Sequence, residues 1–311
     1  VQIMATADHA DHVEMSEVLR KAGADVVVRP RYELGLAMAQ RVRAGNGFSP
    51  IGKLGDVEVA AITVASLDAV GRSLAELDLP ARHQVQVIAI WERGRSLPAI
   101  PSHLLDRDDI LVLAGPHGAL SAFAQRSGSV SDVIVVGAGV VAQAAVEALR
   151  RRGAPVVVVA TGTPAWIGAT RLVVGMATNA TVLEHAGLAK AAALLVATSN
   201  DSLNIAITLR ARLLRDDIEI VARVGEVRNV SSCYRSGADL VICAASLFAN
   251  SCFNLLRLGQ VMLVAEGLFA IHVSVPRELA GRRLASQRPR ICSDIPAPYA
   301  AAVSKCRMPD S

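Results

Sequence analysis

The sequence predicts an α/β fold in which a doubly wound parallel sheet is accompanied by an α+β unit, the pair being repeated in tandem. Runs of β-branched residues alternate with helix-forming segments over residues 131–258. This alternation is typical of a parallel sheet with helices on both faces. Aromatic residues make up only 3% of the 311 residues and hydrophobic residues make up 52%. Ala, Val and Leu must therefore fill the core, which favours helices packed on a sheet.

Composition also excludes several classes of protein. The formal charge is only +4, and the arginines are scattered rather than gathered in a stripe with aromatic residues, so we expect no nucleic-acid partner. The five cysteines form no CxxC pair, which favours reduced thiols in the cytoplasm. Apolar runs stay below the roughly 18 residues that suggest a membrane span, and no signal peptide is recognisable.

The first 126 residues divide into two regions. Residues 1–45 show the order strand, helix, strand, helix, with Gly23 as a helix C-terminal signal and Pro30 after the second strand. The glycine-rich segment 45–55 indicates a linker. Strands and helices then mix without a regular alternation, which predicts an α+β unit. Its expected elements are a strand over 57–64, a helix from Leu67 through GRSLAEL, strands at QVQVIAIWERG and ILVLAG, and a helix over 116–126.

The regular alternation begins at residue 131. The expected strands are 133–136, 156–162, 172–175, 193–201, 218–224 and 239–242. One expected helix follows the first strand, another covers 180–186, two more end near residues 215 and 236, and a crossover helix covers 246–258. The first strand meets Gly137-Ala138-Gly139, and Ala142 follows as the third small residue of a GxGxxA motif. Such a turn lets backbone amides approach a phosphate at the helix N-terminus.

Two pairs of segments match in the same order and at nearly the same spacing. LRKAGADVVV (19–28) matches YRSGADLVI (234–242), and AVGRSLAEL (69–77) matches LAGRRLASQ (279–287). We interpret these matches as a tandem repeat. The predicted domains are the end of a first sheet domain (1–47), an α+β lobe (56–127), a complete sheet domain (130–258) and the start of a second α+β lobe (259–311). On this interpretation the chain begins within one domain and ends within another.

These motifs resemble a known family. The order GxGxxA, VVVV, VVGMATNATVLEHAGL, LLVATSND and YRSGADLVI resembles the TrkA-N lobe of RCK domains (regulators of K⁺ conductance), and residues 56–126 resemble the TrkA-C lobe. The resemblance implies a Rossmann-like N-lobe with an α+β C-lobe. It also implies a cytoplasmic gating module at the inner face of the membrane. Such a module forms a homo-oligomeric ring of paired lobes beneath a potassium channel or transporter pore and senses a nucleotide or an ion.

The resemblance also implies a nucleotide site for NAD, ADP or ATP. Its expected residues are Gly137, Ala138, Gly139, Val140, Val141, Thr161, Met176, Ala177, Thr198 and Asn200. Three positions depart from the family pattern. Val140 replaces a frequent arginine, Thr161 stands where a ribose-binding acid is expected, and Met176 replaces the acid of a GDAT-like turn. A hydroxyl cannot supply the bidentate contact of a carboxylate, so we expect nucleotide binding to be weak or absent. For Asn200 and Asp201 a helix N-cap is the alternative role.

The sequence also offers a candidate metal loop and two cysteines near the crossover helix. Asp8, His9, Asp11, His12 and Glu14 crowd one loop and could suit a divalent ion, but acidic residues at a helix N-terminus are stabilised without one. Cys243 and Cys252 are expected to be core thiols.

Two other classes of protein also compete with the sensor. A nicotinamide-dependent oxidoreductase would share the glycine-rich turn, but Tyr234 and His185 suggest no catalytic constellation. An assembly-only scaffold without ligand would use the helices at 32–43 and 246–258. These helices would present apolar side chains to a partner lobe: Leu34, Leu36, Met38, Leu247, Phe253 and Leu256.

Overall fold

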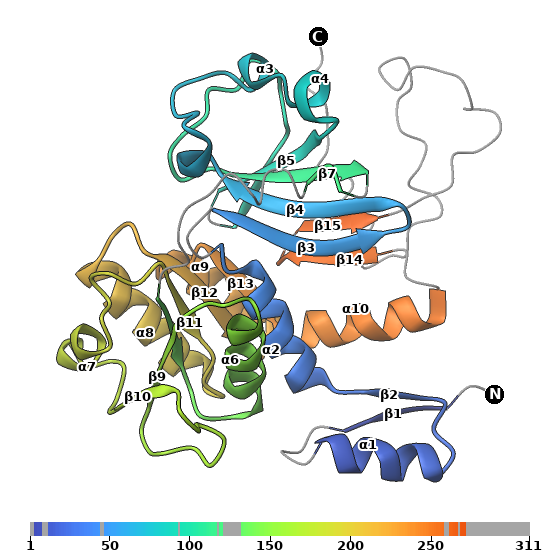
Figure 1. The fold of residues 1–311 in the computed structure, drawn as a ribbon, viewed down its shortest axis with the longest axis vertical. Coiled ribbons are helices and arrows are strands. Elements are labelled where there is room, and N and C mark those ends of the chain that lie inside the picture. The colour runs from blue at the N-terminus through green and yellow to red at the C-terminus, as the bar shows by residue number, and fades with distance from the viewer. Residues whose placement is uncertain are drawn as a thin grey trace.

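The structure is a computed structural model. It describes residues 3–7, 12–43, 47–92, 94–116, 118–120, 132–257, 261–266 and 268–271. Among these residues no helix is long and apolar enough to cross a membrane. Figure 1 shows an α/β lobe and an antiparallel lobe stacked on each other, with the N-terminal segment beside the α/β lobe.

The α/β lobe is built on a six-stranded parallel sheet. In spatial order its strands are β10 (Arg171–Val174), β9 (Val156–Ala160), β8 (Val133–Val136), β11 (Ala193–Val196), β12 (Glu219–Val224) and β13 (Leu240–Cys243). Numbered from β8, this is the order 3-2-1-4-5-6 of a doubly wound sheet. The predicted doubly wound parallel sheet is therefore confirmed, and the strand order reverses between β8 and β11.

Alternate residues of the buried strands supply two separate cores, because successive side chains point to opposite faces. Val133 and Val135 pack with α6 (Val140–Arg151) on one face. Ile134 and Val136 pack on the other face. The helices of that second face are α7 (Ala180–His185), α8 (Asp201–Leu214) and α9 (Val230–Arg235), with the short η2 (Val227–Asn229) before α9.

The first face is completed by a helix from the start of the chain. Helix α2 (Pro30–Arg41) lies beside α6 (Figure 1), and its Leu34 and Met38 are fully buried in the same core as α6. A Cβ atom added to Gly35 would lie 2.3 Å from the Val141 carbonyl oxygen, so the two helices touch backbone to backbone. The apolar side of α2 is thus covered by the α/β lobe of its own chain, and Leu34 and Met38 are not available to a separate partner.

Polar contacts hold the other end of α2. Arg152 donates to the carbonyls of Ala39 at 2.6 Å and Val42 at 3.2 Å. Arg43 forms an ion pair of 3.0 Å with Glu219, whose other carboxylate oxygen accepts the Arg43 amide. Burial raises the pKa of Glu219, and the nearby Arg43 opposes that shift. The C-terminal end of α2 is therefore fixed to the far end of α6 and to the start of β12.

The N-terminal unit repeats the geometry of β12, α9 and β13. Strand β1 (Met4–Thr6), helix α1 (His12–Lys21) and strand β2 (Val26–Val28) form a parallel βαβ unit. The Asp25 carboxylate accepts the Ile3 amide at 2.7 Å, and the Asp239 carboxylate accepts the Ile220 amide at 2.7 Å. Each Asp follows a glycine of φ 105° by two residues. The two matching segments thus share their turn geometry as well as their sequence.

The second lobe is a five-stranded antiparallel sheet in the order β3-β4-β7-β5-β6. Its strands are β3 (Phe48–Leu54), β4 (Val57–Thr63), β5 (Gln86–Glu92), β6 (Arg95–Leu97) and β7 (Ile110–Pro116). The expected linker over 45–55 is wrong because residues 48–54 form β3. Glycine and proline in this segment are atypical of a strand interior. Pro50 nevertheless lies on an edge strand at a register shift, where a missing amide is tolerated.

The helix expected from Leu67 through GRSLAEL is also wrong. A 3₁₀ turn, η1 (Val64–Leu67), ends at Asp68, which has a left-handed conformation. Gly71 then has φ 77°, and the chain regains helical structure only at α3 (Leu74–Leu77) and α4 (Leu79–His83). Of the helix expected over 116–126, Pro116 ends β7 and residues 121–126 lie outside the described residues.

Helix α10 (Ala244–Arg257) leads to a hairpin of β14 (Val261–Ala265) and β15 (Leu268–Ile271) that lies against β3 (Figure 1). Arg41, at the end of α2, donates through Nε to the Val264 carbonyl at 2.9 Å and through Nη2 to the Leu263 carbonyl. Burial lowers the pKa of Arg41 to about 10, a shift that nearby Glu266 opposes. A buried cation thus joins α2 to this hairpin.

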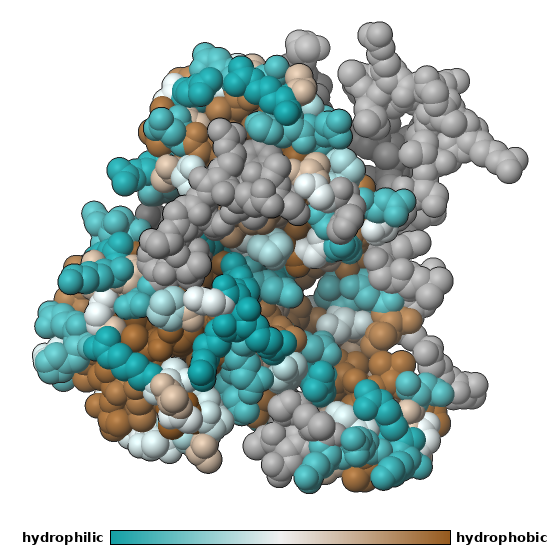
Figure 2. Space-filling view, viewed as in Figure 1, coloured by the Kyte–Doolittle hydropathy of each residue, from teal (hydrophilic) through white to brown (hydrophobic). Residues whose placement is uncertain are grey.

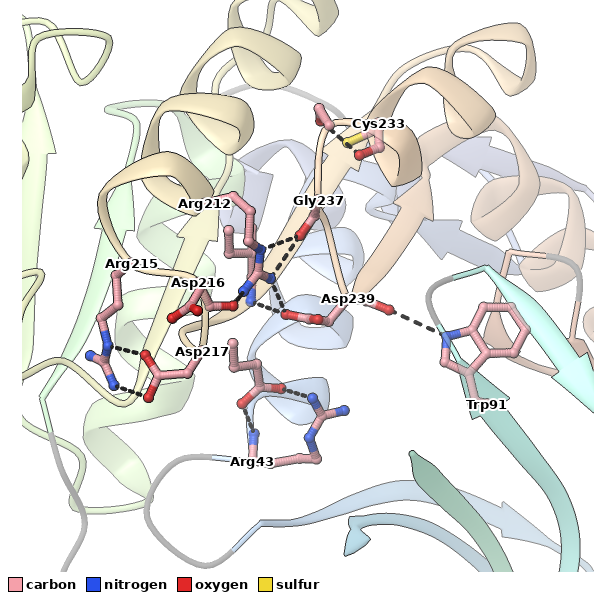
Figure 3. A network of polar contacts seen from close by, with 12 residues as sticks. Arg43, Trp91, Arg212, Arg215, Asp216, Asp217, Cys233, Gly237 and Asp239 are labelled. Carbon is pink, nitrogen blue, oxygen red and sulfur yellow. Dashed lines mark hydrogen bonds and ion pairs between the residues drawn. The ribbon is translucent and has the colours of Figure 1, made fainter. Parts of the chain in front are cut away.

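A polar network at the segment 237–239 joins the two lobes (Figure 3). The Arg212 guanidinium binds the Asp239 carboxylate at 2.8 Å and donates to the Gly237 carbonyl at 2.7 and 3.0 Å. From the antiparallel lobe, the Trp91 indole donates to the Asp239 carbonyl at 3.3 Å, and its ring meets Tyr234 edge on at 6.0 Å. The turn Gly237-Ala238-Asp239 therefore connects the two lobes.

Candidate functional site

A cavity of about 620 Å³ opens at the carboxyl ends of the parallel strands. Residues at the ends of β8, β9, β11 and β12 line it, together with the first residues of α6. The cavity therefore lies at the point where the strand order reverses, which is where open α/β sheets bind ligands. Nine of the ten predicted nucleotide-site residues line it: Gly137, Ala138, Gly139, Val140, Val141, Thr161, Met176, Ala177 and Thr198.

The two glycines of the turn differ in their conformation and in the space around them. Gly137 has φ 137°, and a Cβ atom there would lie 3.0 Å from the Ala197 carbonyl oxygen and 3.4 Å from the Ala142 Cβ. Gly139 is the N-cap of α6 with an ordinary φ of −86°, and an added Cβ would meet nothing within 4 Å. The protein itself therefore requires glycine at 137 only. At Gly139 the open space faces the N-terminus of α6, whose amides and dipole favour an anion.

Asn200 is the predicted residue that does not line the cavity. It is the N-cap of α8, and its side-chain oxygen accepts the Leu203 amide at 2.9 Å, which confirms the alternative structural role. Asp201 accepts the Gly225 amide at 2.7 Å and the Asn229 side chain at 2.6 Å, so it holds the loop after β12. Thr198 donates to the Asn204 side chain at 2.5 Å.

Two cationic residues of the cavity were missed by sequence reasoning. Arg31 lines it from the first turn of α2, and Arg223 lines it from the end of β12. The strand-end position of Arg223 was a usable signal, because ligands bind at the carboxyl ends of parallel strands. For Arg31 no sequence signal existed, since the docking of α2 on this lobe is a long-range contact. Among the described residues that line the cavity, none is Asp or Glu.

A tryptophan closes one side of the glycine-rich turn. Trp166 lies in the segment after β9 and donates from its indole nitrogen to the Ala138 carbonyl at 2.8 Å. It also packs against the core that α6 covers. Met176, which lines the cavity, is 56% exposed, and Val174 at the end of β10 is 58% exposed. Figure 2 shows hydrophobic surface over the part of the lobe where α7 and β10 lie.

Tyr234 and His185, the residues considered for an oxidoreductase, make structural contacts outside the cavity. The Tyr234 hydroxyl accepts the Val241 amide at 3.2 Å, and burial raises the pKa of this phenol. The His185 carbonyl accepts Arg171 at 2.7 Å, and neither Tyr234 nor His185 lines the cavity. Cys243 is fully buried, as expected of a core thiol, and Cys252 is half-buried.

The described residues contain no cluster of three or more His, Cys, Asp or Glu that could hold a metal ion. The metal loop considered from the sequence falls mainly on Asp8, His9 and Asp11, which lie outside the described residues.

A doubly wound lobe with a cavity at its switch point, stacked on an antiparallel lobe, defines a two-lobed module of the dinucleotide-binding α/β class. Comparison with known families makes the assignment specific. The TrkA-N domain matches residues 133–244 and the TrkA-C domain matches residues 59–128, and together they span more than half of the chain. The chain belongs to the RCK-domain proteins.

Solved structures agree with this assignment. The crystal structure of the GsuK RCK domain is 30% identical with a TM-score of 0.64, covering 83% of this chain and 57% of that one. The GsuK channel bound to NAD is 29% identical with a TM-score of 0.64, covering 94% of this chain and 54% of that one. An uncharacterized protein of Methanothermus fervidus is 33% identical over 115 residues, which are 35% of this chain and 18% of that protein. The chain thus spans about half the length of the GsuK chains it matches.

Proposed function

We propose that this chain is a cytoplasmic regulatory module that senses a nucleotide and controls a potassium channel or transporter pore, on the same or a separate chain. The observation that carries the proposal is the cavity at the switch point, where the open space at Gly139 faces the N-terminus of α6. The solved structure of the GsuK channel bound to NAD, at 29% identity, supports a nucleotide ligand. Oligomerisation into a ring with other RCK lobes is part of the proposal.

We also propose the tandem arrangement of lobes. In it, residues 1–47 are the end of a first N-lobe, and residues 259–311 begin a second C-lobe. Two observations support it: the equivalent carboxylate-to-amide hydrogen bonds of Asp25 and Asp239, and the hairpin β14–β15, which follows α10 as β3–β4 follows α2. In this arrangement each crossover helix connects an N-lobe to its C-lobe.

An enzymatic function has less support. Hydride transfer to a carbonyl needs a positioned acid or base beside the cofactor. The described residues that line the cavity include no His, Tyr, Lys, Asp or Glu. The glycine-rich turn by itself fits either class, because one fold serves many functions. The surroundings of the turn therefore favour sensing over catalysis.

Binding measurements on this chain test the proposal. We expect ADP, ATP or NAD to raise the unfolding temperature and to bind in calorimetry, without turnover against a panel of carbonyl substrates. Gly139→Ser is the matched variant, because serine is a good N-cap residue and should leave stability intact while its side chain fills the open space. Binding in the wild type and its loss in Gly139→Ser are the expected results. Turnover of any substrate would reject the regulatory function.

A ligand-free assembly scaffold is the second candidate. Thr161 favours it, because a hydroxyl cannot supply the carboxylate contact that holds ribose hydroxyls in related sites. Met176 favours it as well, because it stands where the related turn carries an acid. Absence of binding by all three nucleotides at millimolar concentration would support the scaffold and reject the nucleotide sensor.

A further inference from the structure

The glycine-rich turn of this chain lacks a cation of its own, since Val140 follows Gly139. A cation is nevertheless placed at the cavity by a different part of the chain. Arg31 lines the cavity, and it belongs to α2, which precedes the α/β lobe by some hundred residues and lies before the antiparallel lobe. A cation of the first half therefore faces the ligand cavity of the second half.

The packing of α2 on α6 explains how Arg31 reaches the end of the cavity at the N-terminus of α6. Gly35 touches the first turn of α6 at the Val141 carbonyl, and Arg152 at the other end of α6 donates to Ala39 and Val42. The N-terminal ends of both helices thus lie at the same edge of the lobe. Arg31 precedes Gly35 by about one helical turn, roughly 5.4 Å, and helical side chains point back toward the N-terminus. Arg31 therefore lies at the end of α2 that is next to the N-terminus of α6, in agreement with its place in the cavity lining.

The charge on the described lining of the cavity favours an anion. The acidic residue in the same turn, Glu33, accepts the Arg29 amide at 3.3 Å and the Ser251 hydroxyl at 3.2 Å, and it does not line the cavity. Arg223 adds a second cation at the end of β12, and no described lining residue carries a negative charge. Guanidinium groups match phosphate oxygens in a bidentate geometry.

We propose that Arg31 binds the phosphate groups of the nucleotide, so that the ligand bridges α2 of the first half and the glycine-rich turn of the second half. This inference rests on the proposed function. On this inference, α2 supplies the cation that the glycine-rich turn lacks, and it links ligand binding to the antiparallel lobe. Helix α2 ends at Arg41, and the chain after it leads to β3 of the antiparallel lobe, so a ligand that holds α2 against α6 also restrains the start of that connection.

The test uses ADP and adenosine as probes on the full chain. Arg31→Gln removes the charge at an exposed position. Arg29→Gln is the matched control at the N-cap of the same helix, because Arg29 stacks on the Tyr32 ring at 4.6 Å and does not line the cavity. We expect Arg31→Gln to weaken ADP binding about ten- to hundredfold, as loss of a charge-assisted contact should. Adenosine binding should be unchanged, Arg31→Lys should retain part of the ADP affinity, and Arg29→Gln should resemble the wild type.

Hydrogen exchange supplies an independent readout. ADP should slow amide exchange in α2 of the wild type, and it should slow it less in Arg31→Gln. Wild-type ADP affinity in Arg31→Gln would overturn the inference and leave the nucleotide sensor intact. An equal loss for ADP and adenosine, or an equal loss in Arg29→Gln, would overturn it as well. If the wild type binds no nucleotide, the proposed function fails first, and that result is distinct from the others.

Discussion

Replacing Gly35 with alanine should separate helix α2 from the α/β lobe. The added Cβ would lie 2.3 Å from the Val141 carbonyl oxygen, 2.7 Å from the Ala144 Cβ and 3.1 Å from the Ala145 amide nitrogen. Two of these three atoms belong to the backbone of α6, which cannot rotate away as a flexible side chain can. The helices must therefore move apart by about 1 Å before the contact becomes ordinary, and a gap of roughly 0.5–1 Å forfeits a quarter to a half of the dispersion energy of the atoms concerned.

The expected cost combines two opposing terms. Overpacking of a close contact costs typically about 1–3 kcal/mol, and a contact against backbone belongs at the upper end of that range. Alanine gains about 0.8–1.0 kcal/mol over glycine inside a helix. The net loss in unfolding free energy is thus about 2 kcal/mol. The same separation should carry Arg31 away from the cavity and weaken ADP binding.

Urea unfolding followed by circular dichroism measures the stability change. Gly162→Ala is the matched control, because a Cβ there would meet nothing within 4 Å; its effect should stay within about 0.5 kcal/mol, as is usual for surface substitutions. A Gly35→Ala protein as stable as the wild type would refute the close backbone contact of α2 with α6, and with it the route by which Arg31 reaches the cavity.

Three further predictions concern the cavity and the buried ion pair. Thr161→Asp should raise NAD affinity about tenfold in calorimetry, because a carboxylate can hold the ribose hydroxyls; no gain would mean that the end of β9 does not meet a ribose. The chain has two tryptophans, and only Trp166 contacts the glycine-rich turn, so nucleotide should change its emission. Trp166→Phe should abolish that change, whereas a signal that survives would place it at Trp91. Burial raises the pKa of Glu219 above its ordinary 4.5, so its stabilising contribution is full below that value and is lost as the pH rises through the raised pKa. The unfolding free energy of the wild type relative to Glu219→Gln should therefore fall over that interval in urea titrations, and a constant difference would contradict the shift.

Sequence reasoning succeeded where the signal is local. The alternation of β-branched runs with helical segments located all six strands of the parallel sheet, because each strand and each turn is specified by neighbouring residues. The GxGxxA motif located the cavity, since the turn at Gly137 needs a positive φ that glycine supplies. The N-cap role of Asn200 followed from its position before α8. Strand β3 was missed because Pro50 and Gly52 imitate a linker, and only pairing with β4 makes the segment a strand.

The sequence by itself determined the doubly wound parallel class of the sheet domain, the strands along the chain and the position of the ligand cavity, because these follow from local periodicity and turn chemistry. Only the tertiary structure decided that α2 covers the open face of the parallel sheet, that Arg31 lines the cavity in place of a cation at Val140, and that Arg41 joins α2 to the second hairpin. These contacts join segments more than a hundred residues apart. They depend on the close approach of two helices at a single glycine, which no local pattern encodes.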